Sequence, residues 1–181
     1  AMNRSGLAAE NFGHAVFGNV IHTEPRDMYI SRCISIGAGM VDSAPALTVN
    51  RLCGSGLQAI ISGAQLIMLG DANAVLAGGA EVMSRGGYLI PAMRWGARLG
   101  HGETTDMMLG ALHDPFGIGH MGITAENVAK DYEIDRDTMD AFALASQQRA
   151  AAAIKAGYFD EQITPVQIAS RKQTAVFEVD E

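Results

Sequence analysis

The stretch "TVNRLCGSGLQAI" (residues 48–60) places one cysteine between a short apolar, strand-like segment and a glycine-spaced run that predicts a helix. A cysteine just before a helix lies near the positive end of the helix dipole, which favours the thiolate over the thiol. Gly54 and Gly56 permit a sharp turn and let a substrate approach backbone N–H groups that can hold an oxyanion. The residues alone leave two interpretations of Cys53 open, a nucleophile or an inert, buried thiol.

The same residues also match a nucleotide-binding pattern. Gly54, Gly56 and Ala59 fit the dinucleotide fingerprint G-x-G-x-x-G/A, and Glu81 follows at the end of the next predicted strand. The fingerprint requires its first glycine at the end of a strand, whereas residues 50–53 separate Gly54 from the strand here. A dinucleotide-dependent oxidoreductase is therefore the less favoured alternative.

Short apolar segments alternate with helical patterns around the cysteine. They predict strands at residues 15–21, 46–49 and 74–77, and helices at residues 25–37 and 56–69. The second helix has only a narrow polar stripe, so we expect most of its surface to be buried. The alternation indicates an α/β fold with a parallel sheet covered on both faces.

The pattern changes after Met83. Residues 84–122 are rich in Gly and Met and lack sustained periodicity, which is typical of a long excursion that serves function or assembly. Two helices are predicted next, the first capped by Thr124 and the second starting after Asp135 and ending before Gly157. The chain begins like the tail of a helix and ends in a strand-like alternation, so we expect a piece of a longer protein.

Composition narrows the class of function. The 181 residues have a net charge of −7 and only 13 dispersed Lys and Arg, so nucleic acid is not an expected partner. No apolar run reaches the ~18 residues that a membrane helix needs, and the expected location is the cytoplasm. Cys33 and Cys53 show neither a disulfide framework nor zinc-type spacing, so both are expected to be free thiols and no metal site is predicted.

A histidine is the obvious base for a reactive thiol, but spacing does not choose among the five in this chain. His120 is preferred because "HMG" directly precedes a predicted helix, with a structural hydrogen-bonding role as its alternative. The other four are His14, His22, His101 and His113.

Three motifs together resemble the thiolases, the acyl-CoA:acyl-CoA C-acetyltransferases, and are most similar to the bacterial biosynthetic β-ketothiolase type. They are "NRLCGSGLQAI" (residues 50–60), "AGGAEVMSR" (77–85) and "HMGITAENVAK" (120–130). The resemblance implies a thiolase-like layered α/β fold, with a mixed sheet flanked by helices and an inserted loop domain. Residues 1–82 would be part of the N-terminal domain with the nucleophile loop, and residues 83–181 a truncated loop domain for CoA binding and tetramerisation.

The resemblance also implies a chemistry. Cys53 would take the acyl group of one acyl-CoA and pass it to the α-carbon of acetyl-CoA, with its own backbone N–H supplying half of an oxyanion hole. Leu112, His120 and Met121 would line the pantetheine and substrate pocket, and residues 89–102 would form the tetramerisation loop. Coenzyme A thioesters would be substrates, with no permanently bound cofactor, in the setting of fatty acid metabolism.

Parts of the family's machinery are absent from these residues. Thiolases carry "NEAF", "GHP" and "CxGG" motifs that supply an asparagine, a catalytic histidine and a second cysteine, and none of these strings occurs here. Val82 also stands where the family commonly has serine. We therefore expect this chain alone to be incomplete for turnover. The alternative is a non-catalytic, thiolase-derived module for CoA binding or oligomerisation.

Overall fold

The structure is a computed structural model that describes residues 1–169 and 174–179. The chain divides into two compact units, Ala1–Met121 and Gly122–Glu181, and each is described by itself. The predicted domain boundary between residues 82 and 83 stays a prediction.

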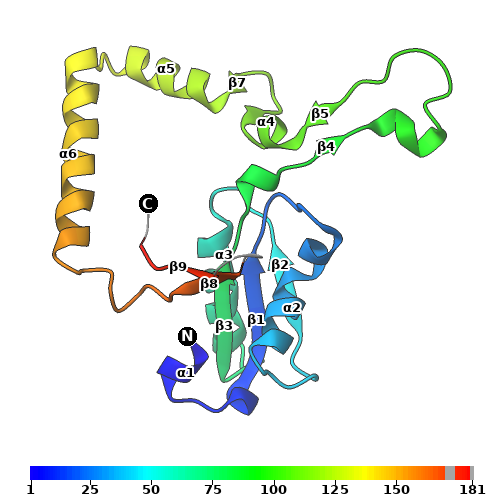
Figure 1. The fold of residues 1–181 in the computed structure, drawn as a ribbon, viewed down its shortest axis with the longest axis vertical. Coiled ribbons are helices and arrows are strands. Elements are labelled where there is room, and N and C mark those ends of the chain that lie inside the picture. Colours follow the sequence, from blue (N-terminus) through cyan, green and yellow to red (C-terminus); the bar gives the residue numbers. More distant parts are fainter. Residues whose placement is uncertain (170–173, 180–181) are drawn as a thin grey trace. The chain divides into compact units, whose positions relative to one another are not determined.

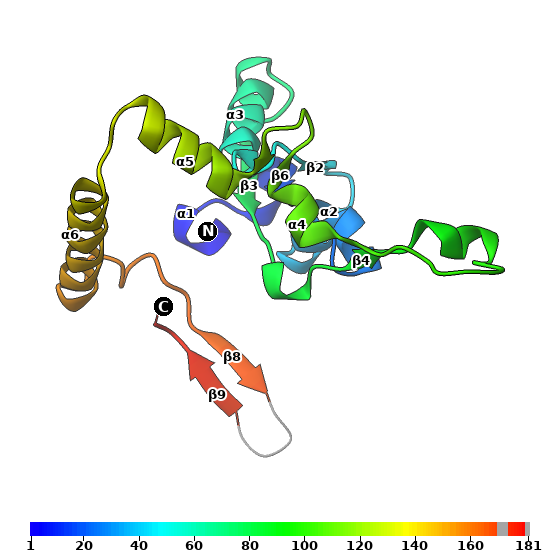
Figure 2. The same ribbon diagram turned by 90° about the horizontal axis from the view of Figure 1, so that it is seen from above.

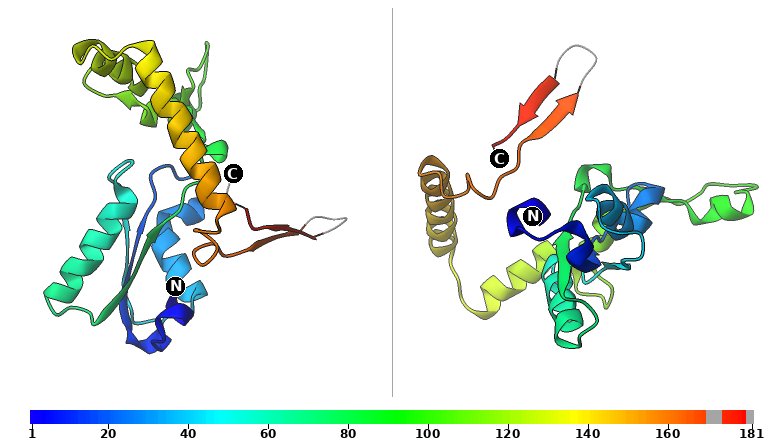
Figure 3. Two further views of the ribbon diagram at one scale, coloured as in Figure 1. Left: turned by 90° about the vertical axis from the view of Figure 1, so that its left-hand side faces the viewer. Right: turned by 90° about the horizontal axis from the view of Figure 1, so that it is seen from below.

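The first unit is built on a parallel sheet of three strands in the order β2-β1-β3. Helices α2 and α3 lie on opposite faces of this sheet (Figure 1; Figure 3, left). The elements are β1 (Phe12–Gly18), η2 (Pro25–Tyr29), α2 (Ile30–Gly37), β2 (Ala46–Val49), α3 (Ser55–Met68) and β3 (Ala74–Gly79). The predicted α/β fold with both faces covered is confirmed. The antiparallel pairs among the described residues lie in separate two-stranded ribbons and not in this sheet.

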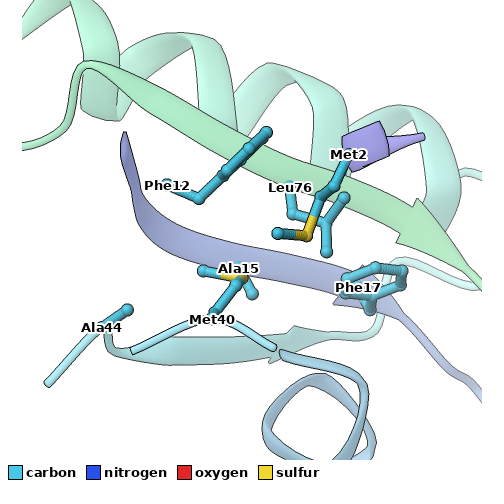
Figure 4. Close-up of a cluster of buried hydrophobic side chains, with 7 residues drawn as sticks. All are labelled: Met2, Phe12, Ala15, Phe17, Met40, Ala44 and Leu76. Atoms are coloured by element: carbon cyan, nitrogen blue, oxygen red, sulfur yellow. The ribbon is translucent and has the colours of Figure 1, made fainter. Parts of the chain in front are cut away.

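The core of this unit gathers around the central strand. Ala15 of β1 is fully buried, and its neighbours come from the first helical turn, from β3 and from the segment that leads into β2. Figure 4 shows the cluster, which consists of Met2, Phe12, Ala15, Phe17, Met40, Ala44 and Leu76. Met2 belongs to the short helix α1 (Met2–Ser5), in agreement with the helix tail predicted at the start of the chain.

Strand β1 begins and ends earlier than the sequence predicts. The apolar run continues to Ile21, but the strand ends at Gly18. The Asn19 N–H still donates to the Val49 carbonyl of β2, and the N–H groups after it bond outside the sheet. Val20 and Ile21 both donate their N–H groups to the Glu81 carboxylate, each at 2.9 Å. A side chain that follows β3 therefore ends β1.

The prediction that α3 is mostly buried is wrong. The helix packs on the sheet through a narrow stripe of small residues, Ser55, Ala59 and Gly63. Gly63 allows a close approach, because a Cβ there would lie 3.0 Å from a Val75 methyl carbon. The apolar side chains on the rest of the helix stay exposed, with exposed fractions of 65% for Leu57, 57% for Ile60 and 84% for Met68.

The excursion after Met83 contains only short elements. Strands β4 and β5 pair antiparallel and form the base of an arm that reaches out through η4, as Figure 2 shows. Strands β6 and β7 form a second small ribbon, separated from β5 by α4. The bounds are η3 (Met83–Arg85), β4 (Tyr88–Leu89), η4 (Pro91–Trp95), β5 (Thr105–Asp106), α4 (Met107–Ala111), β6 (His113–Asp114) and β7 (Gly119–His120).

The second unit consists of helices followed by a hairpin. Helix α6 (Arg136–Lys155) begins as predicted, because the Asp135 carboxylate caps it by accepting a hydrogen bond from the Thr138 N–H at 2.8 Å. Gly157 follows α6 with φ 73°. Helix α5 (Met121–Asp131) begins before Thr124, so the predicted N-cap is wrong. Its start follows from the β6–β7 ribbon, because the Met121 N–H donates to the Leu112 carbonyl at 2.9 Å.

Strands β8 (Val166–Ala169) and β9 (Thr174–Phe177) pair antiparallel. Strand β9 takes up the strand-like alternation predicted at the end of the chain, and residues 180–181 of that alternation lie outside the described residues. Within the part of the chain that the structure describes, no helix is both long and apolar enough to span a membrane.

Candidate active site

The carboxyl ends of β1 and β3 meet the beginning of α3. A Cβ on Gly18 would lie 2.7 Å from the carbonyl carbon of Ser55, and a Cβ on Gly79 would lie 3.7 Å from Cα of Gly56. Because β2 and β3 flank β1 on opposite sides, the chain reverses its direction across the sheet at this point. Ligands of open α/β sheets bind in the crevice outside the strand ends at such a reversal.

The loop between β2 and α3 presents Cys53 at this crevice. Leu52 adopts a left-handed conformation, with φ 48°, which is strained for a branched side chain and turns the chain sharply before the cysteine. The Asn50 side-chain oxygen accepts a hydrogen bond from the Leu52 N–H at 3.0 Å. Ser55 Oγ donates to the Leu52 carbonyl at 2.6 Å and accepts from the Arg51 N–H at 2.9 Å. The turn is thus held from both sides.

Cys53 is exposed, so the interpretation as a buried thiol is wrong. It precedes Gly54, the N-cap of α3, and therefore lies beside the first turn of the helix, whose N–H groups have no partner within the helix. Cys33, by contrast, is half-buried in α2. Of the two free cysteines, only Cys53 combines exposure with a helix N-terminus.

Cys53 opens onto a cavity of about 500 Å³. One wall is formed by Met108 and Ala111 of α4 and by Leu112, the C-cap of this helix, which occur at helical spacing and share one side. The remaining lining residues come from the strand ends and from the loops around them. They are Gly18, Val20, Ile21, Leu52, Ser55, Gly56, Gly79, Ala80, Glu81 and Met83. Most of these side chains are small or apolar, which suits an acyl chain better than a phosphate.

Glu81 joins the two loops that shape this cavity. Its Oε1 accepts hydrogen bonds from the Ile21 N–H at 2.9 Å and from Asn19 Nδ2 at 3.2 Å, and its Oε2 accepts from the Val20 N–H at 2.9 Å. A carboxylate that accepts from several N–H groups forms strong, charge-assisted bonds. Glu81 therefore fixes residues 19–21 as a wall of the cavity.

The predicted pocket residues fall into two groups. Leu112 lines the same cavity as Cys53. His120 and Met121 are not among its lining residues as the structure describes them, although Met121 is tied to Leu112 by the backbone hydrogen bond noted above. The His120 ring packs edge to face against His113, with ring centroids 5.2 Å apart. No described histidine lines the cavity, so a base for Cys53 is not found within these residues.

Sequence reasoning missed several of the lining residues. Met108 falls in the excursion of residues 84–122, which has no sustained periodicity, and Glu81 was considered only as part of the dinucleotide fingerprint. The signal that could have identified this wall is the helical spacing of residues 108, 111 and 112. The helix has only five residues, which is too short for the spacing to stand out in the sequence. Within residues 1–169 and 174–179, no group of three His, Cys, Asp or Glu side chains could hold a metal ion.

The family follows from a comparison with known proteins. The model of the thiolase N-terminal domain matches residues 1–181. The chain belongs to the thiolase family. The dinucleotide interpretation is accordingly dropped, and Gly54 caps a helix here instead of ending a strand.

Several thiolases are similar over the whole chain. The Beta-ketothiolase BktB of Cupriavidus necator is 59% identical over 181 residues, and an acetyl-CoA acetyltransferase of Pseudomonas aeruginosa is 43% identical over 182 residues. These alignments cover 100% and 99% of this chain but 46% of each relative. The chain thus spans about half the length of its relatives and corresponds to their N-terminal half.

Solved thiolase structures share the fold. The acetyl-CoA acetyltransferase of Bacillus anthracis matches with a TM-score of 0.93 and 40% identity, over 100% of this chain and 46% of that one. The human mitochondrial 3-ketoacyl-CoA thiolase in complex with CoA matches with a TM-score of 0.91 and 37% identity, over 100% of this chain and 45% of that one. The thiolase-like fold is therefore confirmed.

Proposed function

We propose that the protein carrying this thiolase N-terminal domain is an acyltransferase. It condenses an acyl-CoA with acetyl-CoA, or cleaves a 3-ketoacyl-CoA with CoA in the reverse direction, through an acyl group held on Cys53. The observation that supports this proposal most strongly is the exposed Cys53, placed beside the N-terminus of α3 at the mouth of an apolar cavity. Relatives named as a β-ketothiolase and as acetyl-CoA acetyltransferases support the same reaction class.

In the first half-reaction, the Cys53 thiolate attacks the thioester carbonyl carbon of an acyl-CoA. A new carbon–sulfur bond forms to Cys53, the bond to the CoA sulfur breaks, and CoA leaves as a thiol after taking up a proton. In the second, the α-carbon of acetyl-CoA loses a proton and attacks the acyl-Cys53 carbonyl. A carbon–carbon bond forms, and the Cys53 thiolate leaves. One thioester replaces another in the first step, so the acyl group stays activated.

The remaining roles follow the same proposal. Leu112, His120 and Met121 contact the pantetheine and the substrate, and CoA thioesters serve as substrates without a permanently bound cofactor. The loop domain of residues 83–181 carries these contacts together with the arm between β4 and β5. Trp95 and Leu99 on this arm have exposed fractions of 84% and 100%, which suits a contact between subunits of a homotetramer. We place the enzyme in the cytoplasm and in fatty acid metabolism.

Turnover needs more than the groups described here. The family's acid and base motifs do not occur in these 181 residues, and no described histidine lines the cavity. The exposed apolar side chains of α3 are also suited to being covered by a further segment. We therefore assign the nucleophile and one wall of the substrate cavity to this chain, and the proton transfers to the rest of the polypeptide.

Acylation of Cys53 tests the proposal directly. The protein, in the longest form that its gene encodes, is incubated with acetyl-CoA, and its intact mass is measured before the adduct is mapped by peptide digestion. We expect one acetyl group on Cys53, which Cys53→Ala abolishes. Cys33→Ala is the matched control, because that thiol is half-buried in α2 and should leave the acetylation unchanged.

Among the described residues no histidine lines the cavity, which favours a second candidate, a non-catalytic module that binds CoA or drives oligomerisation. Such a module would bind CoA, as calorimetry can measure, without transferring an acyl group to Cys53. Binding without acylation in the folded protein would therefore replace the acyltransferase with this second function.

A further inference from the structure

Met108 stands out among the residues around Cys53 because a glycine faces its side chain. Both Met83 and Met108 line the cavity into which Cys53 opens. Gly86 lies behind Met108, and an added Cβ on Gly86 would come within 2.5 Å of Met108 Cγ and 3.3 Å of its sulfur. The methionine side chain therefore occupies space that only a glycine at position 86 leaves open.

The backbone of Met108 is fixed, so only its side chain can respond to a change. The Met108 N–H donates to the Asp106 side-chain Oδ1 at 2.8 Å, which caps α4. The N–H of Met107 donates to the Gly87 carbonyl at 3.0 Å, and Tyr88 pairs with Asp106 in the β4–β5 ribbon. These bonds hold the segment between η3 and β4, which carries Gly86, against the start of α4.

Gly86 is required for space and not for backbone conformation. Its φ of −50° and ψ of 128° are accessible to any residue. Alanine at this position would therefore keep the backbone conformation and displace chiefly the Met108 side chain, because the other near atom, the Met83 carbonyl oxygen, lies 3.3 Å from the added Cβ. Methionine is unbranched and has three rotatable side-chain bonds, so it can swing toward the cavity at a small cost.

We propose that Gly86 and Met108 together set the length of acyl group that the Cys53 cavity accepts, with Met108 as a movable wall and Gly86 as the space into which it withdraws. This inference rests on the proposed acyl transfer at Cys53. Met108 and Ala111 of α4, together with its C-cap Leu112, line the same cavity as the cysteine, so an acyl chain on Cys53 sulfur extends along them. Met108 is a specificity-determining residue in this scheme and takes no part in bond making.

The test compares acetyl-CoA with hexanoyl-CoA as acyl donors to Cys53 in the full protein. One methylene in an apolar pocket changes discrimination by about 10-fold or more. We expect Gly86→Ala to lower the ratio of hexanoyl to acetyl transfer by about 10-fold, and Met108→Ala to raise it. In the double variant, the ratio should follow Met108→Ala, because the displaced side chain is gone. Gly87→Ala is the matched control, since no atom lies within 4 Å of a Cβ there.

A second probe separates this proposal from the proposed function. Methyl and n-pentyl methanethiosulfonates convert a thiol to a mixed disulfide and release methanesulfinate, so they report on the cavity without CoA chemistry. In a Cys33→Ala background, Gly86→Ala should slow the pentyl reagent relative to the methyl one. If this shift occurs while no acyl-CoA acylates Cys53, the acyltransferase is refuted and the movable wall stands. If Gly86→Ala and Gly87→Ala give the same ratios, or Met108→Ala leaves them unchanged, the movable wall is refuted.

Discussion

Replacing Gly18 with alanine tests how closely α3 approaches the end of β1. The added Cβ would lie 2.7 Å from both the carbonyl carbon and the Cβ of Ser55, and 3.0 Å from the Gly56 nitrogen. Carbon atoms in contact prefer about 3.5–4.0 Å. Because these atoms belong to the main chain or its first side-chain carbon, they cannot rotate away, and the start of α3 must move.

The close contacts allow an estimate of how much this movement lowers the free energy of unfolding. An extra carbon in a packed interior costs about 1–3 kcal/mol. Shifting Ser55 also stretches its bonds to the Arg51 N–H and the Leu52 carbonyl, each worth about 1 kcal/mol. We expect the free energy of unfolding to fall by about 2–4 kcal/mol. The rate of acetyl transfer to Cys53 should fall as well, because the loop moves with the helix.

Urea unfolding, followed by circular dichroism, measures the first effect, and mass spectrometry of the acetylated protein measures the second. Gly37→Ala at the end of α2 serves as the matched control, because a Cβ there meets no atom within 4 Å. Its unfolding free energy should change by less than about 1 kcal/mol. If Gly18→Ala is as stable as Gly37→Ala and acetylates as fast as the unsubstituted protein, the close approach is not real.

Three further changes address other contacts. Glu81→Gln replaces the oxygen that accepts from the Val20 N–H with a donor. This change should lower the free energy of unfolding by about 1–3 kcal/mol and broaden the Val20 amide signal in NMR spectra. An unchanged amide signal would contradict the role of Glu81 in holding residues 19–21. Ser31→Ala removes the buried hydroxyl that accepts from the Phe17 N–H at 3.2 Å, and it should lower the free energy of unfolding by about 1–3 kcal/mol in urea titrations. Equal urea midpoints for the variant and the unsubstituted protein would contradict this expectation. The hydrogen bonds from Thr138 hold the pKa of Asp135 below its usual value of 3.8. Capping by Asp135 is then complete above its unfolded pKa and is lost as the pH falls through the lower folded value, so amide signals of the first turn of α6 should titrate there, and Asp135→Asn should abolish that titration.

The sequence predicted correctly those structural elements that depend on residues close together in the chain. Strand β2 has the predicted bounds, and Asp135 caps α6 through its own side chain, three residues from its partner. The cysteine loop could also be predicted, because Gly54 and the helical segment after it lie within a few residues of Cys53. Each of these features depends on neighbours in the chain.

Contacts between distant segments account for the rest. The end of β1 is set by Glu81, some sixty residues away, and the separation in sequence hides that bond. The exposed side of α3 could not be distinguished from a buried one, since an apolar stripe has the same letters in either setting. Met108 lines the cavity because the β4–β5 ribbon brings it next to Gly86. Sequence periodicity cannot predict such a pairing, because each of the two strands has only two residues.

The sulfur atoms around the cavity have a consequence for oxidative damage. Cys53 and Met83 are both exposed, and Met108 shares their cavity, so peroxide that reaches one reaches all three. The cysteine would pass through sulfenic acid toward irreversible sulfinic acid, whereas methionine sulfoxide would place a polar, reducible group in an apolar wall. A thiol reductant restores only the first stage of the cysteine damage. Recovery of the remaining function after treatment with methionine sulfoxide reductase would therefore distinguish a damaged wall from a damaged nucleophile.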